Sequence, residues 1–304
     1  MYRGGPVRVT GYVCDREGTA MPIDVEKVLG AELPGAAMTW DADDVILYHL
    51  GVGAGVPPNA DGELEYTYEA RLKVLPSFGV LPVFSALGGL GGVEGLSFNP
   101  MMLLHGEQEI EVFAPIPTHA KVDNAAKVTG IYDKGKGALL VIDATTTDES
   151  GNRLFANRFS AYIRGEGGFG GESGPPPGND PPARAPDHVV ESKTLPQQAL
   201  LYRLSGDKNP LHVDPAFAKM GGFDTPILHG LCSYGIVCKA VVDAALGGAV
   251  GKVSRYGARF TGVVFPGETI VTSMWDEGDR IVVAARTGER DSPVISNAAI
   301  TVRT

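Results

Sequence analysis

The chain has 304 residues, of which 43 % are hydrophobic and 20 % are charged, so it is long enough for about two domains of typical size. Its 26 Lys and Arg residues against 36 Asp and Glu residues give a net charge of −10. That balance disfavours nucleic acid and anionic membranes as partners. No run of about 18 uninterrupted apolar residues occurs, so no membrane-spanning helix is expected. The three cysteines form no Cys-x-x-Cys pair, which disfavours a disulfide scaffold or zinc ribbon and is typical of a cytoplasmic protein.

Residues 1–20 are polar and glycine-rich, and we expect a poorly packed extension without a signal or transit peptide. Met21 is an alternative start. The first half, residues 21–164, predicts one apolar helix over Pro76–Leu90. Four strands are expected in it: Glu107–Ala114, Ala120–Tyr132, Ala138–Thr147 and Arg153–Arg164.

Residues 165–186 separate the two halves. Seven glycines and six prolines in this segment predict a linker without helix or strand. Its Gly165-x-Gly167-x-x-Gly170 has the spacing of a dinucleotide-binding loop, which needs a helix after the third glycine. Pro175-Pro176-Pro177 follows instead, and this disfavours a dinucleotide cofactor.

The second half, residues 187–304, repeats the order of elements. Leu231–Leu246 is apolar on all sides and ends at Gly247-Gly248, which predicts a buried helix. Four strands are expected after it: Arg255–Phe265, Thr269–Trp275, Arg280–Arg286 and Val294–Arg303. The short turns between them indicate an antiparallel sheet.

Similar short segments recur at nearly one spacing in the two halves. Pro76 and Pro226 are 150 residues apart, and Leu47-Tyr48-His49-Leu50 precedes Leu201-Tyr202-Arg203-Leu204 by 154 residues. The alternative to a duplication is chance similarity of short apolar strings. A duplication predicts an α+β protein in which each half is a long apolar helix wrapped by an antiparallel sheet. We expect the two sheets to join edge to edge, because an unpaired edge strand is a liability.

An acid and an imidazole stand five residues apart in the second half, at Asp207 and His212. Such a pair can share the protons of one water molecule. The surrounding Gly-Asp-x-Asn-Pro is also ordinary turn chemistry, which is the alternative interpretation. When the repeat is continued without gaps, Gly53 and Pro58 take these two positions in the first half. We therefore expect any chemistry to come from the second half.

Several short motifs together resemble the signature of the MaoC-like hydratases, also called 2-enoyl-CoA hydratase 2. The resemblance runs from about residue 22 to residue 304 and is greatest to the two-domain form, found in peroxisomal multifunctional enzyme type 2 and in free-standing bacterial proteins. It implies a double hotdog fold. The motifs are Tyr202–His212, Pro226–Cys232, Leu75–Gly79, Leu104–Gln108, Asp133–Gly135, Gly167–Gly171 and Ala258–Phe260.

The resemblance implies a catalytic dyad of Asp207 and His212, with Asn209 helping to place the water. It implies that the backbone N–H of Gly230 is the oxyanion donor, and amides at the start of a helix are indeed unpaired. The alternative interpretation of His229-Gly230 is a helix cap with a core histidine. The resemblance also implies four substrate-binding residues: His105, Gly106, Lys134 and Phe260.

The implied activity is the reversible hydration of a trans-2-enoyl-CoA to a (3R)-3-hydroxyacyl-CoA in fatty acid metabolism. Asp207 and His212 would activate one water, and no metal or redox cofactor is expected. The alternatives are a dehydratase acting on acyl-carrier-protein thioesters and a non-catalytic acyl-thioester binding protein. We expect the first half to be catalytically inert and to hold the acyl chain. The acyl group, a fatty chain or a sterol side chain, and a homodimeric assembly are left open.

Overall fold

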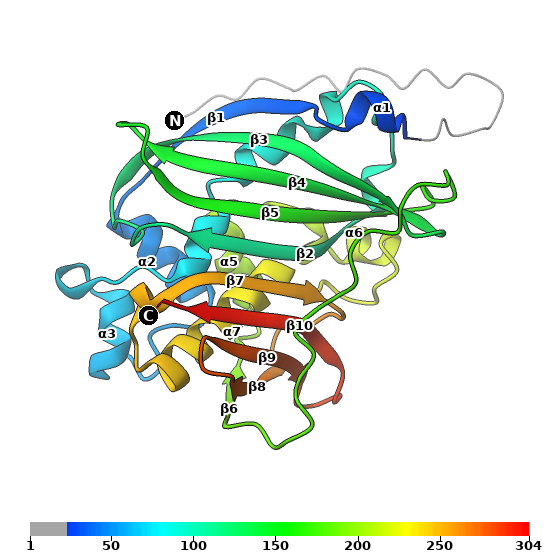
Figure 1. Ribbon diagram of the computed structural model, residues 1–304. Helices are drawn as coiled ribbons and strands as arrows, with labels where there is room; N and C mark the ends of the chain where they lie inside the picture. The colour runs from blue at the N-terminus through cyan, green and yellow to red at the C-terminus, as the bar shows by residue number, and fades with distance from the viewer. Residues whose placement is uncertain (1–22, 304) are drawn as a thin grey trace.

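The frame of the protein is one antiparallel sheet of ten strands in the order β1-β3-β4-β5-β2-β7-β10-β9-β8-β6 (Figure 1). The computed structural model describes residues 23–303, apart from the side chains of residues 85–86. The expected extension over residues 1–20 and the alternative start at Met21 lie outside the described residues. The strands are β1 (Glu32–Trp40), β2 (Leu103–Val112), β3 (Ala120–Asp133), β4 (Gly137–Asp148), β5 (Arg153–Arg164), β6 (His188–Lys193), β7 (Val253–Phe260), β8 (Thr269–Asp276), β9 (Arg280–Thr287) and β10 (Pro293–Val302).

The two halves meet at one strand pair in the middle of the sheet. Strands β2 and β7 run antiparallel, with Glu107 opposite Arg259 at one end of the ladder and Glu111 opposite Arg255 at the other. The Arg259 guanidinium also donates to the Glu107 carboxylate across this seam (2.8 Å). The expected edge-to-edge joining is confirmed, and it removes the free edge that each half would otherwise expose.

The second half has the expected buried helix, α7 (Gly230–Leu246). It begins at the N-cap residue His229 and ends at Gly247, whose left-handed backbone (φ 59°) favours glycine. Its side chains are buried along nearly the whole first three turns. Because the strands of this half pack around it, the α+β double hotdog fold is confirmed here in the expected form.

The first half lacks the long helix that the sequence analysis expected over Pro76–Leu90, so that prediction is wrong. Three short elements replace it: the 3₁₀ turn η2 (Pro76–Val80), the single helical turn α4 (Phe84–Leu87) and the 3₁₀ turn η3 (Gly88–Gly92). Proline and glycine inside the segment disfavour a continuous helix. Gly79 is needed for packing, because a Cβ there would lie 2.6 Å from Ile110 Cδ1.

Most of the shorter elements have no counterpart among the predicted ones, including strands β1 and β6. Two short helices, α2 (Ala42–Gly51) and α5 (Gln198–Tyr202), carry the repeated Leu-Tyr motif. Their tyrosines, Tyr48 and Tyr202, pack together in the core with ring centroids 6.0 Å apart. The remaining helices are α1 (Val25–Val28), α3 (Asp61–Thr67) and α6 (Pro215–Met220). The remaining 3₁₀ turns are η1 (Glu69–Arg71), η4 (Pro100–Met102), η5 (Arg203–Ser205), η6 (Pro210–His212) and η7 (Val250–Lys252).

The glycine- and proline-rich segment after β5 forms neither helix nor strand up to β6. Its first part is held on the β3–β4 turn, where the Asp133 carboxylate accepts from the N–H groups of Gly168 (2.8 Å) and Gly170 (2.7 Å). These hydrogen bonds hold the pKa of Asp133 below its usual range. No helix follows the third glycine, so the segment lacks the feature that a dinucleotide-binding loop requires.

No helix within residues 23–303 is both long and apolar enough to cross a membrane.

Candidate active site

A cavity of about 470 Å³ lies where the start of β2 meets the end of β7. Both halves line it, and the walls are mainly apolar. Its large apolar side chains include Phe84, Leu103 and Phe159 from the first half and Leu231, Phe260 and Val264 from the second. A cavity of this size with few polar groups is typical of a site for a small organic ligand.

Asp207 and Asn209 line the cavity from a loop that precedes η6. The Asp207 carboxylate accepts from the backbone N–H of Asn209 (3.1 Å), and the Asn209 side-chain oxygen accepts from the N–H of Leu211 (3.0 Å). The second bond makes Asn209 the N-cap of η6. Local hydrogen bonds of this kind fix the loop and leave the Asn209 amide group free to donate.

His212 ends η6 and is buried, with 8 % of its surface exposed. Its Nδ1 lies 2.9 Å from the carbonyl oxygen of Ile227, just before α7. Because a carbonyl oxygen only accepts, Nδ1 carries the hydrogen and Nε2 keeps its lone pair. Burial lowers the pKa of His212 below 6.5, which favours the neutral ring at pH 7.

The sequence-predicted acid and imidazole come together in the fold. One carboxylate oxygen of Asp207 and one ring nitrogen each of His212 and His229 lie within 4.8 Å of one another. A separation up to this length leaves room for a water molecule that touches both the carboxylate and the imidazole. The Gly-Asp-x-Asn-Pro segment also forms the turn that was the alternative interpretation. This turn positions Asp207 and His212.

His229 contacts both residues of the predicted dyad. It is the N-cap residue of α7 and is buried, as interpreted from the sequence, although its side chain makes no capping hydrogen bond. Its Nε2 donates to the backbone carbonyl of Asp207 (3.2 Å), and its ring stacks on that of His212 with centroids 3.7 Å apart. Burial lowers the pKa of His229 to about 2, so this ring is neutral throughout the physiological range.

The same three side chains, Asp207, His212 and His229, have the spacing of a metal site, but the two imidazole rings lack the orientation that a metal ion needs. Imidazole lone pairs lie in the ring plane, and two ligating rings must point their nitrogens at one ion. The rings of His212 and His229 are stacked at only 29° to one another, so their lone pairs cannot converge. This geometry favours a water over a metal ion, and the expected lack of a metal stays a prediction.

Gly230 is the first residue of α7 and lines the cavity. The N–H groups of the first helical turn have no partner inside the helix and lie at its positive end. A Cβ at Gly230 would lie 3.4 Å from Cδ1 of Phe260, which is an ordinary contact distance, so the first residue of α7 lies next to this ring. The position suits the predicted oxyanion donor, a role that stays a prediction.

Two of the predicted substrate-binding residues, His105 and Phe260, lie together in the cavity wall. Their ring centroids are 4.8 Å apart, and His105 also packs on Phe159 at 3.9 Å. Burial lowers the pKa of His105 to about 3, so its ring is neutral there. Gly106 follows at an irregularity in the β2–β5 register between His105 and Glu107.

The fourth predicted substrate-binding residue, Lys134, does not reach this cavity. It lies in the β3–β4 turn, and its Nζ donates to the carbonyl of Ser173. It lines a separate cavity of about 340 Å³ together with Arg158 and Ser160. The two cavities share no lining residue, so they are separate spaces. A contact of Lys134 with the ligand stays a prediction.

One cavity residue that the sequence analysis missed is Arg164, the last residue of β5. No motif marked it, because its position at the cavity depends on the pairing of β5 with β2.

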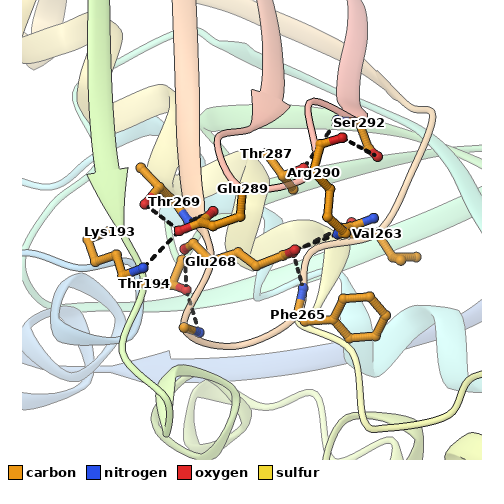
Figure 2. A network of polar contacts seen from close by, with 11 residues as sticks. Lys193, Thr194, Val263, Phe265, Glu268, Thr269, Thr287, Glu289, Arg290 and Ser292 are labelled. Atoms are coloured by element: carbon orange, nitrogen blue, oxygen red, sulfur yellow. Dashed lines mark hydrogen bonds and ion pairs between the residues drawn. The ribbon is translucent and has the colours of Figure 1, made fainter.

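One wall of the cavity, residues 261–264, is held from outside by a polar network (Figure 2). The Glu268 carboxylate accepts from the N–H of Phe265 (2.7 Å) and from the guanidinium of Arg290 (2.8 Å). Arg290 also donates to the carbonyl of Val263 (2.6 Å), a cavity residue. The hydrogen bond from Arg290 holds the pKa of Glu268 below its usual range. The charged pair therefore keeps this loop in one place.

Each half of the chain matches a known protein family. Residues 38–165 match the family described as MFE-2 hydratase 2 N-terminal domain, and residues 178–298 match the MaoC like domain. The chain is 45 % identical to enoyl-CoA hydratase ChsH3 of Mycobacterium tuberculosis over 90 % of this chain and 97 % of that protein. Enoyl-CoA hydratase 2 of Arabidopsis thaliana, a peroxisomal protein by its name, is 40 % identical over 88 % of this chain and 92 % of that one.

Solved structures agree with these matches. A MaoC-like dehydratase from Phytophthora capsici superposes with a TM-score of 0.83, at 34 % identity over 93 % of this chain and 99 % of that chain. Peroxisomal multifunctional enzyme type 2 from Drosophila melanogaster gives a TM-score of 0.78 at 35 % identity, over 90 % of this chain and 48 % of that one. Sequence, fold and the arrangement of both halves thus lead to one conclusion: the chain belongs to the two-domain, hydratase 2 group of the MaoC-like family.

Proposed function

We propose that the protein is a hydro-lyase that reversibly hydrates trans-2-enoyl-CoA thioesters to (3R)-3-hydroxyacyl-CoA. The observation that carries this proposal is the approach of the Asp207 carboxylate and a ring nitrogen of His212 to within 4.8 Å at the wall of an apolar cavity. The names of two relatives, both enoyl-CoA hydratases, support the same reaction class.

The proposed mechanism places one water between Asp207 and the unprotonated Nε2 of His212. As the water oxygen bonds to C3, the dyad removes one of its protons and returns a proton to C2, so that H and OH add across the double bond. The Asn209 amide helps to hold the water. The Gly230 N–H donates a hydrogen bond to the thioester oxygen as negative charge develops on it, an effect worth about 3 kcal/mol per donor in other systems. The reaction needs neither a metal nor a redox cofactor.

The acyl chain is proposed to lie against the first half, where Phe84, Leu103 and Phe159 line the cavity. That half has no acid or imidazole at Gly53 and Pro58, and its broken helix leaves room for a long chain. A higher kcat/KM on a ten-carbon than on a four-carbon enoyl-CoA is the expected result.

An acyl-carrier-protein substrate is a second candidate. A relative from Mycobacterium tuberculosis that is 40 % identical is named a 3-hydroxyacyl-thioester dehydratase, which leaves its carrier open. Rates on crotonyl-CoA and on the matching enoyl-acyl-carrier protein decide between the two carriers. A cytoplasmic location and a homodimer stay predictions, and some relatives carry peroxisomal names.

The dyad is tested with Asp207→Asn and His212→Ala, assayed on crotonyl-CoA. Each variant should lose activity by about 10²–10⁴-fold, the usual contribution of a general acid or base. The double variant should be little worse than the worse single one, because both residues act on one water. Cys232→Ala, at the third residue of α7, is the control and should keep its rate.

Circular dichroism and thermal unfolding would show that each variant is folded. If Asp207→Asn kept more than about a tenth of the wild-type turnover, the dyad assignment would be wrong. If both single variants kept full activity, a different site would have to carry the reaction. A wild-type protein that binds crotonyl-CoA without turning it over would favour the non-catalytic, thioester-binding alternative.

A further inference from the structure

The cavity has one cation on its wall whose charge the proposed chemistry does not use. Arg164 is exposed at the end of β5 and lines the same cavity as Asp207 and His212. Within the described part of the chain, its guanidinium makes no ion pair or side-chain hydrogen bond. Within residues 23–303, seven of the eleven other arginines form ion pairs, as Arg158 does with Asp143. An unpaired guanidinium beside a ligand cavity is available to an anion.

The charges around Arg164 also favour an anionic ligand. Asp207 is the single carboxylate among the described residues that line the cavity. Lys136 lies beside Arg164, since its carbonyl accepts from the N–H of Gly165 (2.9 Å), and its exposed side chain has no partner among residues 23–303. The nearby Asp133 carboxylate accepts from backbone N–H groups and forms no ion pair with either cation within residues 23–303.

The guanidinium presents a planar fork of donors that matches the oxygens of a phosphate. The mainly apolar wall of the cavity suits the acyl chain of a thioester, whereas Asp207 and His212 would meet its reacting carbons. We propose that Arg164, assisted by Lys136, binds a phosphate group of the coenzyme A carried by the substrate. This inference rests on the proposed function for the identity of the ligand, and it names the group that distinguishes the carrier.

The test compares two thioesters that differ only beyond the pantetheine arm. Arg164→Gln should raise KM for crotonyl-CoA by roughly 5-fold, the effect of losing one partly exposed charge-assisted contact. Its kcat should stay the same, and its KM for crotonyl-pantetheine, which has no phosphate, should not change. Arg164→Lys should recover part of the loss. Added salt should raise the wild-type KM for crotonyl-CoA more than that of Arg164→Gln.

The matched control is Arg153→Gln. Arg153 is also an exposed arginine on β5, but it lies at the opposite end of the strand, over the ring of Phe113. It should leave both KM values unchanged. An equal rise of KM for both thioesters in Arg164→Gln, or no rise for either, would overturn the proposal.

Calorimetric binding of free coenzyme A and of pantetheine separates this inference from the proposed function, because it needs no turnover. Binding of coenzyme A that is about 5-fold weaker in Arg164→Gln, with pantetheine unaffected, supports the phosphate contact even if no enoyl-CoA is hydrated. Full hydratase activity with identical coenzyme A binding in the two proteins would leave the proposed function intact and refute the contact.

Discussion

His229 shows how the surroundings of a reactive pair are built from a residue that need not react. Its Nε2 bonds to the backbone carbonyl of Asp207 and its ring covers His212. The first contact fixes the position of the acid, and the second excludes water from one face of the imidazole. Neutral His229 therefore supports the pair through position and burial, and we regard it as a positioning residue.

The predicted effect of His229→Ala is a fall in kcat by about 10-fold with little change in KM, since small displacements of catalytic groups are costly. Exposure of His212 should also raise its pKa toward 6.5, so the acid limb of the rate profile should move to higher pH. A pH series of kcat on crotonyl-CoA measures both effects. His229→Gln keeps a donor for the Asp207 carbonyl and should recover part of the rate. An unchanged profile in His229→Ala would mean that the residue only fills space.

At the scale of elements, α7 packs against α2 through one glycine. A Cβ on Gly235 would lie 2.5 Å from Cγ1 of Val52 and 2.7 Å from the hydroxyl oxygen of Tyr48, both in the first half. Helix α7 can approach the first half this closely because Gly235 has no side chain. Farther along α7, Lys239 pairs with Glu63 of α3 (2.6 Å), which adds a charged contact between the two halves.

We predict that Gly235→Ala lowers the free energy of unfolding by about 1–3 kcal/mol, the usual cost of overpacking a tight contact. Urea unfolding followed by circular dichroism measures this change. The control is Gly62→Ala in α3, where a Cβ meets nothing within 4 Å and alanine should stabilise the helix by about 0.5–1 kcal/mol. Equal stabilities for Gly235→Ala and the wild type would show that the two halves can separate slightly at no cost.

The elements that could be predicted from the sequence are those whose pattern is local. Helix α7 was visible because Leu231–Leu246 is apolar on all sides and stops at a glycine pair, and the strands of both halves followed their turns closely. The missing helix of the first half was harder to foresee. Its segment is also rich in apolar residues. Pro82 and the glycines make a helix there less stable, and packing against the sheet has to compensate for that loss if a helix is to form. The segment forms short turns instead.

The candidate site divides in the same way. Asp207, Asn209 and His212 lie in one short segment, so their motif was readable, and Gly230 follows at a helix start. Arg164 could not be found, since it reaches the cavity only through the pairing of β5 with β2. Sequence position also gave no sign that the Lys134 side chain would bond to the Ser173 carbonyl instead of facing the cavity.

For the whole molecule, the fold places histidines with a lowered pKa in both halves. His105 and His212 line the cavity, His229 stacks on His212, and His49 is buried in the first half. His49 is satisfied only when neutral: its Nδ1 donates to the carbonyl of Tyr66 (2.8 Å) and its Nε2 accepts from the N–H of Leu75 (3.2 Å). A second ring proton would face the Leu75 N–H, so protonation opposes the folded state.

The predicted consequence is a loss of stability on mild acidification. Burial lowers the pKa of His49 from 6.5 to about 4. At a pH between these two values, His49 is protonated in the unfolded chain and neutral in the folded chain. Stability then falls as the pH falls, and His49 alone accounts for about 3 kcal/mol by pH 4. His105 and His229, with a pKa of about 3 and about 2, act in the same direction. Carboxylates such as Glu289, whose pKa is lowered to about 2 by its hydrogen bond to Lys193, add their loss only below about pH 4.5.

Urea midpoints at pH 7, 6 and 5 measure this histidine window before carboxylate titration begins. The wild type should lose stability steadily across it, whereas His49→Gln should be less stable at pH 7 but should lose less between pH 7 and pH 5. Glutamine can offer one donor and one acceptor at the same place and does not titrate, so the difference in slope should approach one proton. His119→Gln, at an exposed histidine outside the core, is the control and should keep the wild-type slope. If the slopes of wild type and His49→Gln were equal, the buried neutral ring would not be a source of the acid sensitivity, and the loss would have to come from the cavity histidines.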